Sequence, residues 1–457
     1  MLKKIFIISL LGFIFTAFGF GCKGLTTAEQ ALVKPITLNY WTVYNDIEQL
    51  QKFATDYQQL RTYVKINFRK VRPEEFENLF INALADDVGP DIVSINPRDL
   101  RKYQNRLATM PASLDLSKVF TQGKYFKETV MVQEKQIMPT ARAIKDNFVS
   151  TVYADAVIDG EIYGLPLSVD ALALYYNKDL LDQAGIPEAP ATWPEFMEAV
   201  KNSTRFDKNG DLIQAGAALG TGNNIERSFD ILSLLMMQSG LIMAKDSYVS
   251  FANGLDKPEQ GHPALTALRF YTDFAQPTKE VYTWNEKMSD SLEEFTRGKV
   301  VFYFGFAYDY PRLKKLAPQL NLAVVPIPQL NEAKPINVAN YWLETVVKKS
   351  RHQNEAWDFI RFLTTSANIK KYTEAVKRPT PLRSQIIAQQ EDAVLGPFVA
   401  TILQTENWYK GKDSAQAEAV FAELIHNYLQ ITGDEKSQLR QAAEMIRQTA
   451  QKVRQTM

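Results

Sequence analysis

The hydrophobic pattern near the start of the chain predicts an alternation of strands and helices. Alternating β-branched and aromatic residues predict strands at Ile36–Trp41, Val64–Phe68 and Asp91–Ile95. Between them, apolar residues spaced three and four apart predict amphipathic helices over residues 47–60 and 76–84. This β-α-β-α-β order implies a parallel sheet covered by helices, and ligands of such sheets bind beyond the carboxyl ends of the strands.

The hydrophobic pattern in the rest of the chain predicts both helices and strands. Residues 97–160 are expected to be mixed and mostly helical, and the C-terminal region to end in a packed helix over 434–453. The segment DKNGD at 207–211 superficially resembles a calcium loop but lacks the glycine and glutamate that such a loop needs, so it is interpreted as an Asn-Gly hairpin turn. Further helices are expected over 226–239, 263–275, 291–297, 355–363 and 367–376, and strands over 299–304, 322–325 and 341–347.

The central stretch, YGLPLSVDALALYYNKDLLDQAGI at 163–186, contains one residue that breaks the apolar pattern. Asp170 lies inside the run from Val169 to Leu174, between two predicted strands. A carboxylate in such a place is unfavourable unless it is hydrogen-bonded or paired. Two interpretations remain open: backbone donors satisfy Asp170 in a turn, or it lies at the rim of a cleft and binds a ligand.

The N-terminus has the features of an export signal. Lys3 and Lys4 precede the apolar run Ile5–Phe20, which is short for a membrane span. We expect residues 1–21 to be the signal and residues 22–35 a polar tether. Cys22 is the only cysteine, so no intramolecular disulfide is possible, and its position resembles the lipid-modified cysteine of bacterial lipoproteins. A simple secretory signal and an uncleaved anchor are the alternatives.

Length and charge limit the classes of protein that fit. A chain of 457 residues is too long for one ordinary core and suits two lobes. Lysine plus arginine and aspartate plus glutamate both number 52, so the formal net charge of zero gives no electrostatic argument for a nucleic-acid partner.

Catalytic and metal-binding motifs are missing from the sequence. His262, His352 and His426 lie in separate contexts without a second ligand at metal-binding spacing, so neither a metal nor a cofactor is expected. No nucleophile elbow or phosphate loop is found. We therefore do not expect an enzyme, although paired carboxylates leave an envelope glycoside hydrolase as an alternative.

Several segments, in order, resemble one family. The central stretch with the following ATWPEF, then FTRGKVVFYFGFAYDY, NYWLETVVKKSRHQNEAWDFIRFLTT and RPTPLRS, are similar to extracellular (family 1) solute-binding proteins of ABC importers, of the sugar-binding type. The resemblance extends from about Ile36 to the C-terminus. Two positions depart from the family pattern: Phe304-Gly305-Phe306-Ala307 replaces the usual Asn-Gly-Pro-Trp, and Leu172 stands where some maltose-type members have tyrosine. Two alternatives to sugar transport therefore remain open: the chain binds a solute that is not a sugar, or it has kept the fold and acts as a surface adhesion protein.

The resemblance implies a two-lobed, periplasmic-binding-protein-like (type II) α/β fold. Each lobe would be a mostly parallel sheet flanked by helices, with the ligand cleft between the lobes. We expect the first lobe to take residues 36–120 and 328–385, and the second to take 121–327 and 386–457. The implied function is that of an exported monomer, lipid-anchored at the outer face of the cytoplasmic membrane or periplasmic, that closes on a sugar or oligosaccharide and delivers it to permease subunits.

Candidate ligand contacts combine aromatic faces with polar groups that bind hydroxyls. Each also has a structural interpretation, such as lobe core for Trp41 and Trp342 or pairing with Lys348 for Glu344. In the family an acidic residue at the position of Asp170 often binds ligand hydroxyls, so we expect Trp41, Asp170 and Trp342 to face one shared hollow. The candidates are Trp41, Tyr44, Asn96, Asp170, Asn223, Asn224, Tyr308, Tyr341, Trp342, Glu344 and Arg378.

Overall fold

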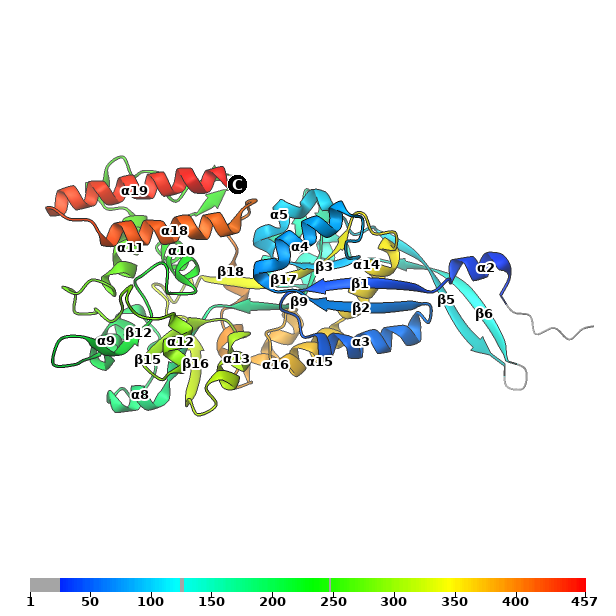
Figure 1. Cartoon of the computed structure of the whole chain (residues 1–457), viewed down its shortest axis with the longest axis horizontal. Coiled ribbons are helices and arrows are strands. Elements are labelled where there is room, and N and C mark those ends of the chain that lie inside the picture. The colour runs from blue at the N-terminus through cyan, green and yellow to red at the C-terminus, as the bar shows by residue number, and fades with distance from the viewer. Residues whose placement is uncertain (1–24, 124–126, 246–247) are drawn as a thin grey trace, which may run out of the picture.

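The computed structural model describes residues 25–123, 127–245 and 248–457, which form two lobes side by side along the long axis (Figure 1). The expected signal at residues 1–21 and the expected lipidation site Cys22 lie outside these ranges. Each lobe has its own cluster of buried apolar residues. Within the described ranges, no helix is long and apolar enough to cross a membrane.

The first lobe is built on a seven-stranded sheet with the order β18-β17-β3-β1-β2, in which β4 and β9 also pair with β17. Strand β1 runs parallel to β2 and β3, which confirms the predicted β-α-β-α-β unit. In Figure 1, α4 and α5 lie above these strands and α3 and α15 below them. The elements are α2 (Thr27–Leu32), β1 (Ile36–Thr42), α3 (Ile47–Leu60), β2 (Val64–Lys70), α4 (Pro73–Ala85), β3 (Ile92–Ile95), α5 (Leu100–Tyr103), β4 (Leu107–Ala108), β5 (Ser113–Gln122), β6 (Glu128–Ile137), α6 (Ala141–Asn147), α7 (Ser150–Ala156), β7 (Val157–Ile158), β8 (Glu161–Ile162), β9 (Leu165–Ala171), β17 (Asn337–Val347), α14 (Gln353–Leu363), α15 (Ser366–Val376), α16 (Ile386–Gln390) and β18 (Thr405–Glu406).

The second lobe surrounds a five-stranded sheet with the order β11-β12-β15-β10-β16. The DKNGD segment is the expected turn between β11 and β12, and Gly210 there has a positive φ of 85°. The C-terminal helix α19 packs on α18 through one buried side, as predicted. The elements are β10 (Ala173–Asn177), α8 (Lys178–Gln183), α9 (Trp193–Ser203), β11 (Arg205–Phe206), β12 (Leu212–Ala217), α10 (Ser228–Gln238), β13 (Ala244–Lys245), β14 (Tyr248–Val249), α11 (Pro263–Asp273), α12 (Ser291–Thr296), β15 (Val300–Gly305), α13 (Asp309–Leu316), β16 (Leu322–Pro326), α17 (Gly396–Val399), α18 (Ser414–Leu429) and α19 (Glu435–Gln455).

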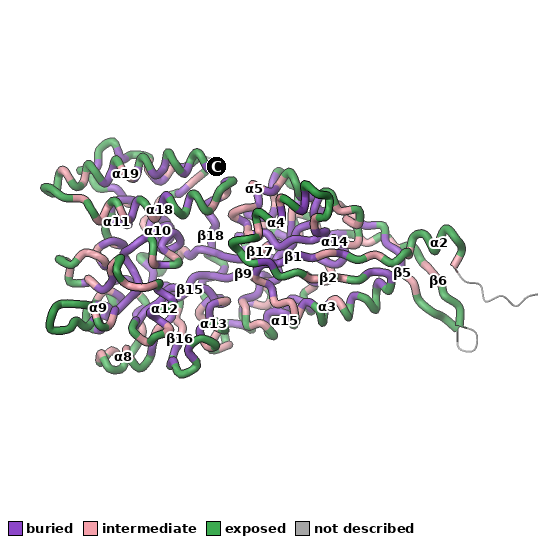
Figure 2. Tube along the Cα trace, viewed as in Figure 1, coloured by how far each residue is buried: buried purple, intermediate pink, exposed green. Residues whose placement is uncertain are grey.

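The central stretch is where the chain passes from the first sheet to the second. Strand β9 pairs with β17 in the first sheet, and β10 pairs with β15 and β16 in the second. Leu172 alone separates β9 from β10, so the crossing is almost fully extended backbone. Figure 2 shows this middle region as buried.

Several expectations differ from the structure. The second sheet is not mostly parallel, because β10 runs antiparallel to both β15 and β16 and β11 runs antiparallel to β12, so that only the β12–β15 pair is parallel. Residues 97–160 are not mostly helical, because residues 113–137 form a long antiparallel hairpin of β5 and β6. The buried clusters also do not follow the expected lobe boundaries. Core residues from Met138 to Val169 pack in the first cluster, while those from Leu172 to Val338 pack in the second, because β9 hydrogen-bonds into the first sheet.

Candidate functional site

A cavity of about 620 Å³ lies between the lobes. Two of its lining residues come after the carboxyl ends of parallel strands: Tyr44 lies two residues after β1, and Asn96 directly follows β3. This is the position expected for a ligand site in such a sheet. The opposite wall comes from the second lobe, chiefly from the segment before α10 and from the first turns of α10 and α18.

Three aromatic rings form one side of the cavity. The ring of Tyr44 lies over that of Trp342, with centroids 4.1 Å apart and planes inclined by 34°. Tyr308, from the second lobe, has its centroid 5.6 Å from that of Tyr44 and 6.0 Å from that of Trp342. All three residues are half-buried, and burial raises the pKa of Tyr44 above its ordinary value. The rings therefore offer partly open apolar faces that are held in a fixed arrangement.

Two amide side chains, those of Asn96 and Asn340, line the cavity beside these rings and are held by hydrogen bonds. Asn96 donates from Nδ2 to Oδ1 of Asn340 at 2.9 Å, and Asn340 donates from its own Nδ2 to the Tyr308 hydroxyl at 3.2 Å. Asn96 Oδ1 in turn accepts from the Arg98 backbone N–H at 3.0 Å. This chain of bonds fixes the orientation of both amides and links the first lobe to Tyr308 of the second.

Charged side chains span the cavity from one lobe to the other. The Arg98 guanidinium of the first lobe forms an ion pair with Asp230 and contacts Glu418 Oε1 at 3.3 Å, both on the second lobe. Burial opposes the charge of Arg98, but the two carboxylates outweigh this effect and raise its pKa. Next to it, Ser414 donates its hydroxyl to Asp99 Oδ1 at 2.6 Å, a second link between the lobes.

Arg227 adds a cation beside the aromatic rings. Its guanidinium carbon lies 5.4 Å from the ring centroid of Phe306 and 5.5 Å from that of Tyr308. It also forms an ion pair with Glu226 at 2.8 Å. The cavity therefore presents apolar ring faces, ordered amides and charges of both signs, a mixture suited to holding a polar ligand that also has apolar surface.

Five of the eleven candidate residues line this cavity, and six do not. Of the expected trio, only Trp342 faces the hollow. Those that line it are Tyr44, Asn96, Asn223, Tyr308 and Trp342. The residues that the structure places elsewhere are Trp41, Asp170, Asn224, Tyr341, Glu344 and Arg378.

Asp170 is satisfied within the protein. Its Oδ1 accepts from the Ala171 N–H at 2.9 Å, and its Oδ2 accepts from the Tyr308 N–H of the second lobe at 3.1 Å. The side chain is almost completely buried, and burial raises its pKa to about 7. Of the two interpretations left open by the sequence, the backbone donors are the one that the structure supports, although one donor comes from the other lobe.

Two more of the candidates that do not line the cavity are core residues. Trp41 is buried in the first cluster with the Arg69 guanidinium carbon 4.6 Å from its ring centroid. Tyr341 is buried as well, and its hydroxyl donates to Asp155 Oδ2 at 2.7 Å.

The remaining three have structural partners. Asn224 donates from Nδ2 to the carbonyl oxygens of Asn285 and Met288, both at 3.0 Å, while Arg378 donates to the Tyr44 carbonyl at 2.9 Å. Glu344 is fully buried and does not pair with Lys348. Its carboxylate accepts from the hydroxyl of Tyr40, from Ser94 Oγ at 2.6 Å and from Asn45 Nδ2 at 2.6 Å, and burial raises its pKa.

None of the charged residues that line the cavity is among the eleven candidates. Asp230 lies in the first turn of α10 and Glu418 in the second turn of α18, and acidic residues near the start of a helix are common and carry no specific signal. Asn340 was detectable, because residues 340 and 342 share one face of a strand and Tyr341 points to the other. The missed residues are Arg98, Asp99, Glu226, Arg227, Phe229, Asp230, Asn340, Ser414 and Glu418. Among the described residues, no cluster of three or more His, Cys, Asp or Glu is arranged to hold a metal ion.

Comparisons with known proteins agree with this architecture. Residues 49–393 match the family model described as bacterial extracellular solute-binding protein. A putative binding protein of Brucella abortus is 29% identical over 241 residues, which are 50% of this chain and 53% of that protein. The chain thus spans about half the length of the first curated relatives that it matches. The multiple sugar-binding protein of Streptococcus mutans is 20% identical over 93% of both chains.

Solved structures match over nearly the whole chain. A cyclo/maltodextrin-binding protein complexed with maltotetraose superposes with a TM-score of 0.69 at 15% identity, covering 93% of this chain and 98% of that one. The sugar-binding protein MalE of Xanthomonas citri gives a TM-score of 0.67 at 18% identity, covering 91% and 98%. At these identities the likeness shows the fold, which confirms the expected two-lobed α/β architecture. The proteins compared here are named as binding proteins, not enzymes.

Proposed function

The chain belongs to the bacterial extracellular solute-binding protein family, and we propose that it captures a carbohydrate for an ABC importer. The observation that carries this proposal is the group of three rings, Tyr44, Trp342 and Tyr308, at a cavity that also contains ordered amides. Sugar rings have apolar C–H faces and a rim of hydroxyls. Aromatic faces cover the former at low entropic cost, and amide or carboxylate groups bind the latter.

The relatives support the choice of a carbohydrate. The multiple sugar-binding protein of Streptococcus mutans and the maltodextrin-binding protein MdxE of Bacillus subtilis are among the matched proteins. The cavity volume of about 620 Å³ lies in the range of small-ligand sites. The maltodextrin-binding relative favours a ligand of more than one sugar ring, so an oligosaccharide is the class that we propose.

Capture would work by hinge closure. Both lobes contribute to the cavity, so a ligand makes more contacts in the closed form than in the open one and shifts the equilibrium toward closure. The closed, loaded form would then dock on the permease from outside the cytoplasmic membrane. Micromolar affinity corresponds to about −8 kcal/mol, which a few charged hydrogen bonds and stacked rings supply after ordering costs. Anchoring through a lipid on Cys22 is part of the proposal.

A thermal-shift panel tests the ligand class. Maltotetraose, mannotriose and tagatose, each bound in one of the matched structures, are the first ligands to assay. We expect an oligosaccharide to raise the melting temperature and Trp342→Ala to abolish the shift, since that variant removes the ring stacked on Tyr44. Tyr248→Ala, at an exposed aromatic residue of the second lobe, is the control and should keep the shift. The carbohydrate assignment is overturned if a wide sugar panel gives no shift while another solute class does.

A further inference from the structure

The hairpin of β5 and β6 projects from the end of the first lobe that lies away from the second lobe (Figure 1). Its strands are paired along their full length, from Ser113 opposite Ile137 to Gln122 opposite Glu128. Leu114 and Leu116 at its base are buried in the first cluster, whereas the outer half is largely exposed (Figure 2). An isolated two-stranded ribbon is at best marginally stable in water, so a partner for the outer half would explain its length.

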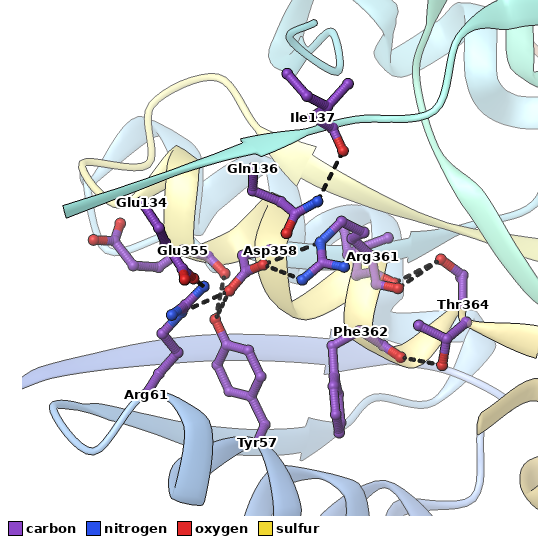
Figure 3. A network of polar contacts seen from close by, with 12 residues as sticks. Tyr57, Arg61, Glu134, Gln136, Ile137, Glu355, Asp358, Arg361, Phe362 and Thr364 are labelled. Atoms are coloured by element: carbon purple, nitrogen blue, oxygen red, sulfur yellow. Dashed lines mark hydrogen bonds and ion pairs between the residues drawn. The ribbon is translucent and has the colours of Figure 1, made fainter. Parts of the chain in front are cut away.

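The base of the ribbon is firmly attached to the lobe. Arg61, which follows α3 and is almost completely buried, forms ion pairs with Glu134 of β6 at 2.5 Å and with Asp358 of α14 at 2.9 Å. The Tyr57 hydroxyl donates to the same Asp358 carboxylate at 3.0 Å. Figure 3 shows these side chains converging from α3, β6 and α14. The ribbon is therefore held as a fixed extension of the first lobe.

Large apolar side chains are exposed at this end of the molecule. Phe120 and Val132, on the same face of the ribbon, are 40% and 45% exposed, and Ile137, on the opposite face at the base of the ribbon, is 65% exposed. Leu32 of α2 and Leu60, the last residue of α3, are exposed as well, and α2 lies at the same end as the ribbon in Figure 1. Apolar residues gathered on one projecting surface indicate an interaction site, whereas single exposed ones do not.

We propose that this apolar end of the first lobe, led by the β5–β6 ribbon, rests on the surface of a lipid bilayer. The described chain begins at Leu25, three residues after Cys22, and three extended residues reach about 10 Å. Both a lipidated Cys22 and an uncleaved apolar segment at Ile5–Phe20 would bring the bilayer to the end where α2 and the ribbon lie. Apolar side chains of a surface-bound protein enter the boundary between headgroups and acyl chains.

Two observations favour lipid over a protein partner. A partner that detects closure must contact both lobes, and the ribbon lies at the end of the first lobe farthest from the second. The ribbon is also close to neutral, since residues 113–137 contain four lysines and three acidic residues, a net charge of +1. With so small an excess of charge, contact depends mainly on apolar insertion, so phosphatidylcholine vesicles should suffice.

The test places a fluorescent probe on the ribbon of the full chain. Phe120→Cys is labelled with an environment-sensitive dye, and the protein is reconstituted into phosphatidylcholine vesicles with and without nitroxide-labelled lipid. Ile213→Cys, at an exposed apolar residue of the second lobe, is the matched control, and the unsubstituted chain gives the label background of Cys22. We expect the probe at residue 120 to shift to the blue and to lose about half of its fluorescence to the quencher, because surface-bound apolar groups enter the bilayer by about 5–10 Å. The probe at residue 213 should change little.

Three results would overturn the inference. The first is a chain that floats with the vesicles while both probes remain equally unquenched. In the second, the probe at residue 120 is protected only in native membranes that contain the importer, which assigns the surface to a protein. In the third, the chain does not float at all, and anchoring fails as well. None of these results depends on the sugar-induced thermal shift, so failure here is distinguishable from failure of the proposed function.

Discussion

Arg98 should control the balance between open and closed forms. It is an arginine of the first lobe whose side chain is 11% exposed, paired with Asp230 of the second lobe, which is 6% exposed. Arg98→Met keeps an unbranched apolar stem and removes the guanidinium charge, so the closed form is left with a buried, unpaired carboxylate. Breaking a buried pair in this way costs about 3–5 kcal/mol. Loss of the half-exposed Glu418 contact adds at most about 1 kcal/mol.

The cost should fall mainly on the closed form, because opening the lobes lets water reach Asp230. A loss of about 3 kcal/mol changes an equilibrium roughly 100-fold. The first-turn position of Asp230 in α10 moderates the effect, since the helix N-terminus stabilises a negative charge. Small-angle X-ray scattering of the ligand-free protein should therefore give a larger radius of gyration for Arg98→Met than for the unsubstituted chain.

Two further variants make the reasoning refutable. Arg98→Met combined with Asp230→Leu removes both charges and should return most of the compactness, since no unpaired carboxylate remains. Arg297→Met breaks ion pairs that lie within the second lobe, with Glu293 and Glu294, and should leave the radius of gyration unchanged. If Arg98→Met stays as compact as the unsubstituted chain, or if the double variant is as expanded as the single one, the pair does not hold the lobes together.

Three other predictions concern buried groups. Because burial raises the pKa of Asp170 to about 7, the folded protein holds a proton that the unfolded chain releases near pH 4. The free energy of unfolding should therefore fall by up to about 4 kcal/mol as the pH rises from about 4 to about 7. Thermal melts of Asp170→Asn should show a flatter pH profile. Glu344→Gln replaces a carboxylate that accepts from three buried donors by an amide that is itself partly a donor, so the free energy of unfolding should fall by about 1–3 kcal/mol. The matched control, Glu332→Gln at an exposed position, should lower it little. Equal urea-unfolding midpoints for the two variants would contradict this prediction. Gly222→Ala places a Cβ 2.7 Å from the Ala422 carbonyl oxygen and should lower stability by about 1–3 kcal/mol, unless calorimetry finds an unchanged melting temperature.

The local spacing of apolar residues was sufficient to predict most of the helices and strands. The helix over 47–60 and the strands at 36, 64 and 91 appear within a residue or two of their expected bounds, since a wide apolar stripe or a strict alternation has one stable burial. The β5–β6 ribbon was missed because its outer half has apolar residues on both faces, for example Phe120 on one and Met131 on the other. Because this outer half buries neither face, it gives no clean alternation, and its exposed apolar residues are explained by the proposed partner, which the folding pattern does not encode.

The candidate site was harder to predict, because strand ends identify an edge of the sheet but not which side chains face the hollow there. Tyr44 and Asn96 follow strand ends and line the cavity, but Trp41, only three residues before Tyr44, is buried in the core. Period two would have separated Trp342 from Tyr341, since neighbours along a strand point to opposite faces. Arg98, Asp230 and Glu418 meet only because the lobes meet, and nothing local to any of them indicates the other two.

Asp170 shows why a polar residue in an apolar strand does not by itself locate a ligand. Its position implies that some donor must satisfy the carboxylate, and this inference was correct. The donor from the other lobe is the backbone N–H of Tyr308, which is 138 residues away in the sequence and reaches Asp170 only through the aromatic turn before α13. Because Tyr308 also lines the cavity, Asp170 acts on the site indirectly, by fixing the backbone of a residue that faces the hollow. Asp170→Asn should consequently weaken ligand binding less than Trp342→Ala, and equal or greater weakening in a binding titration would place the carboxylate in the ligand contact after all.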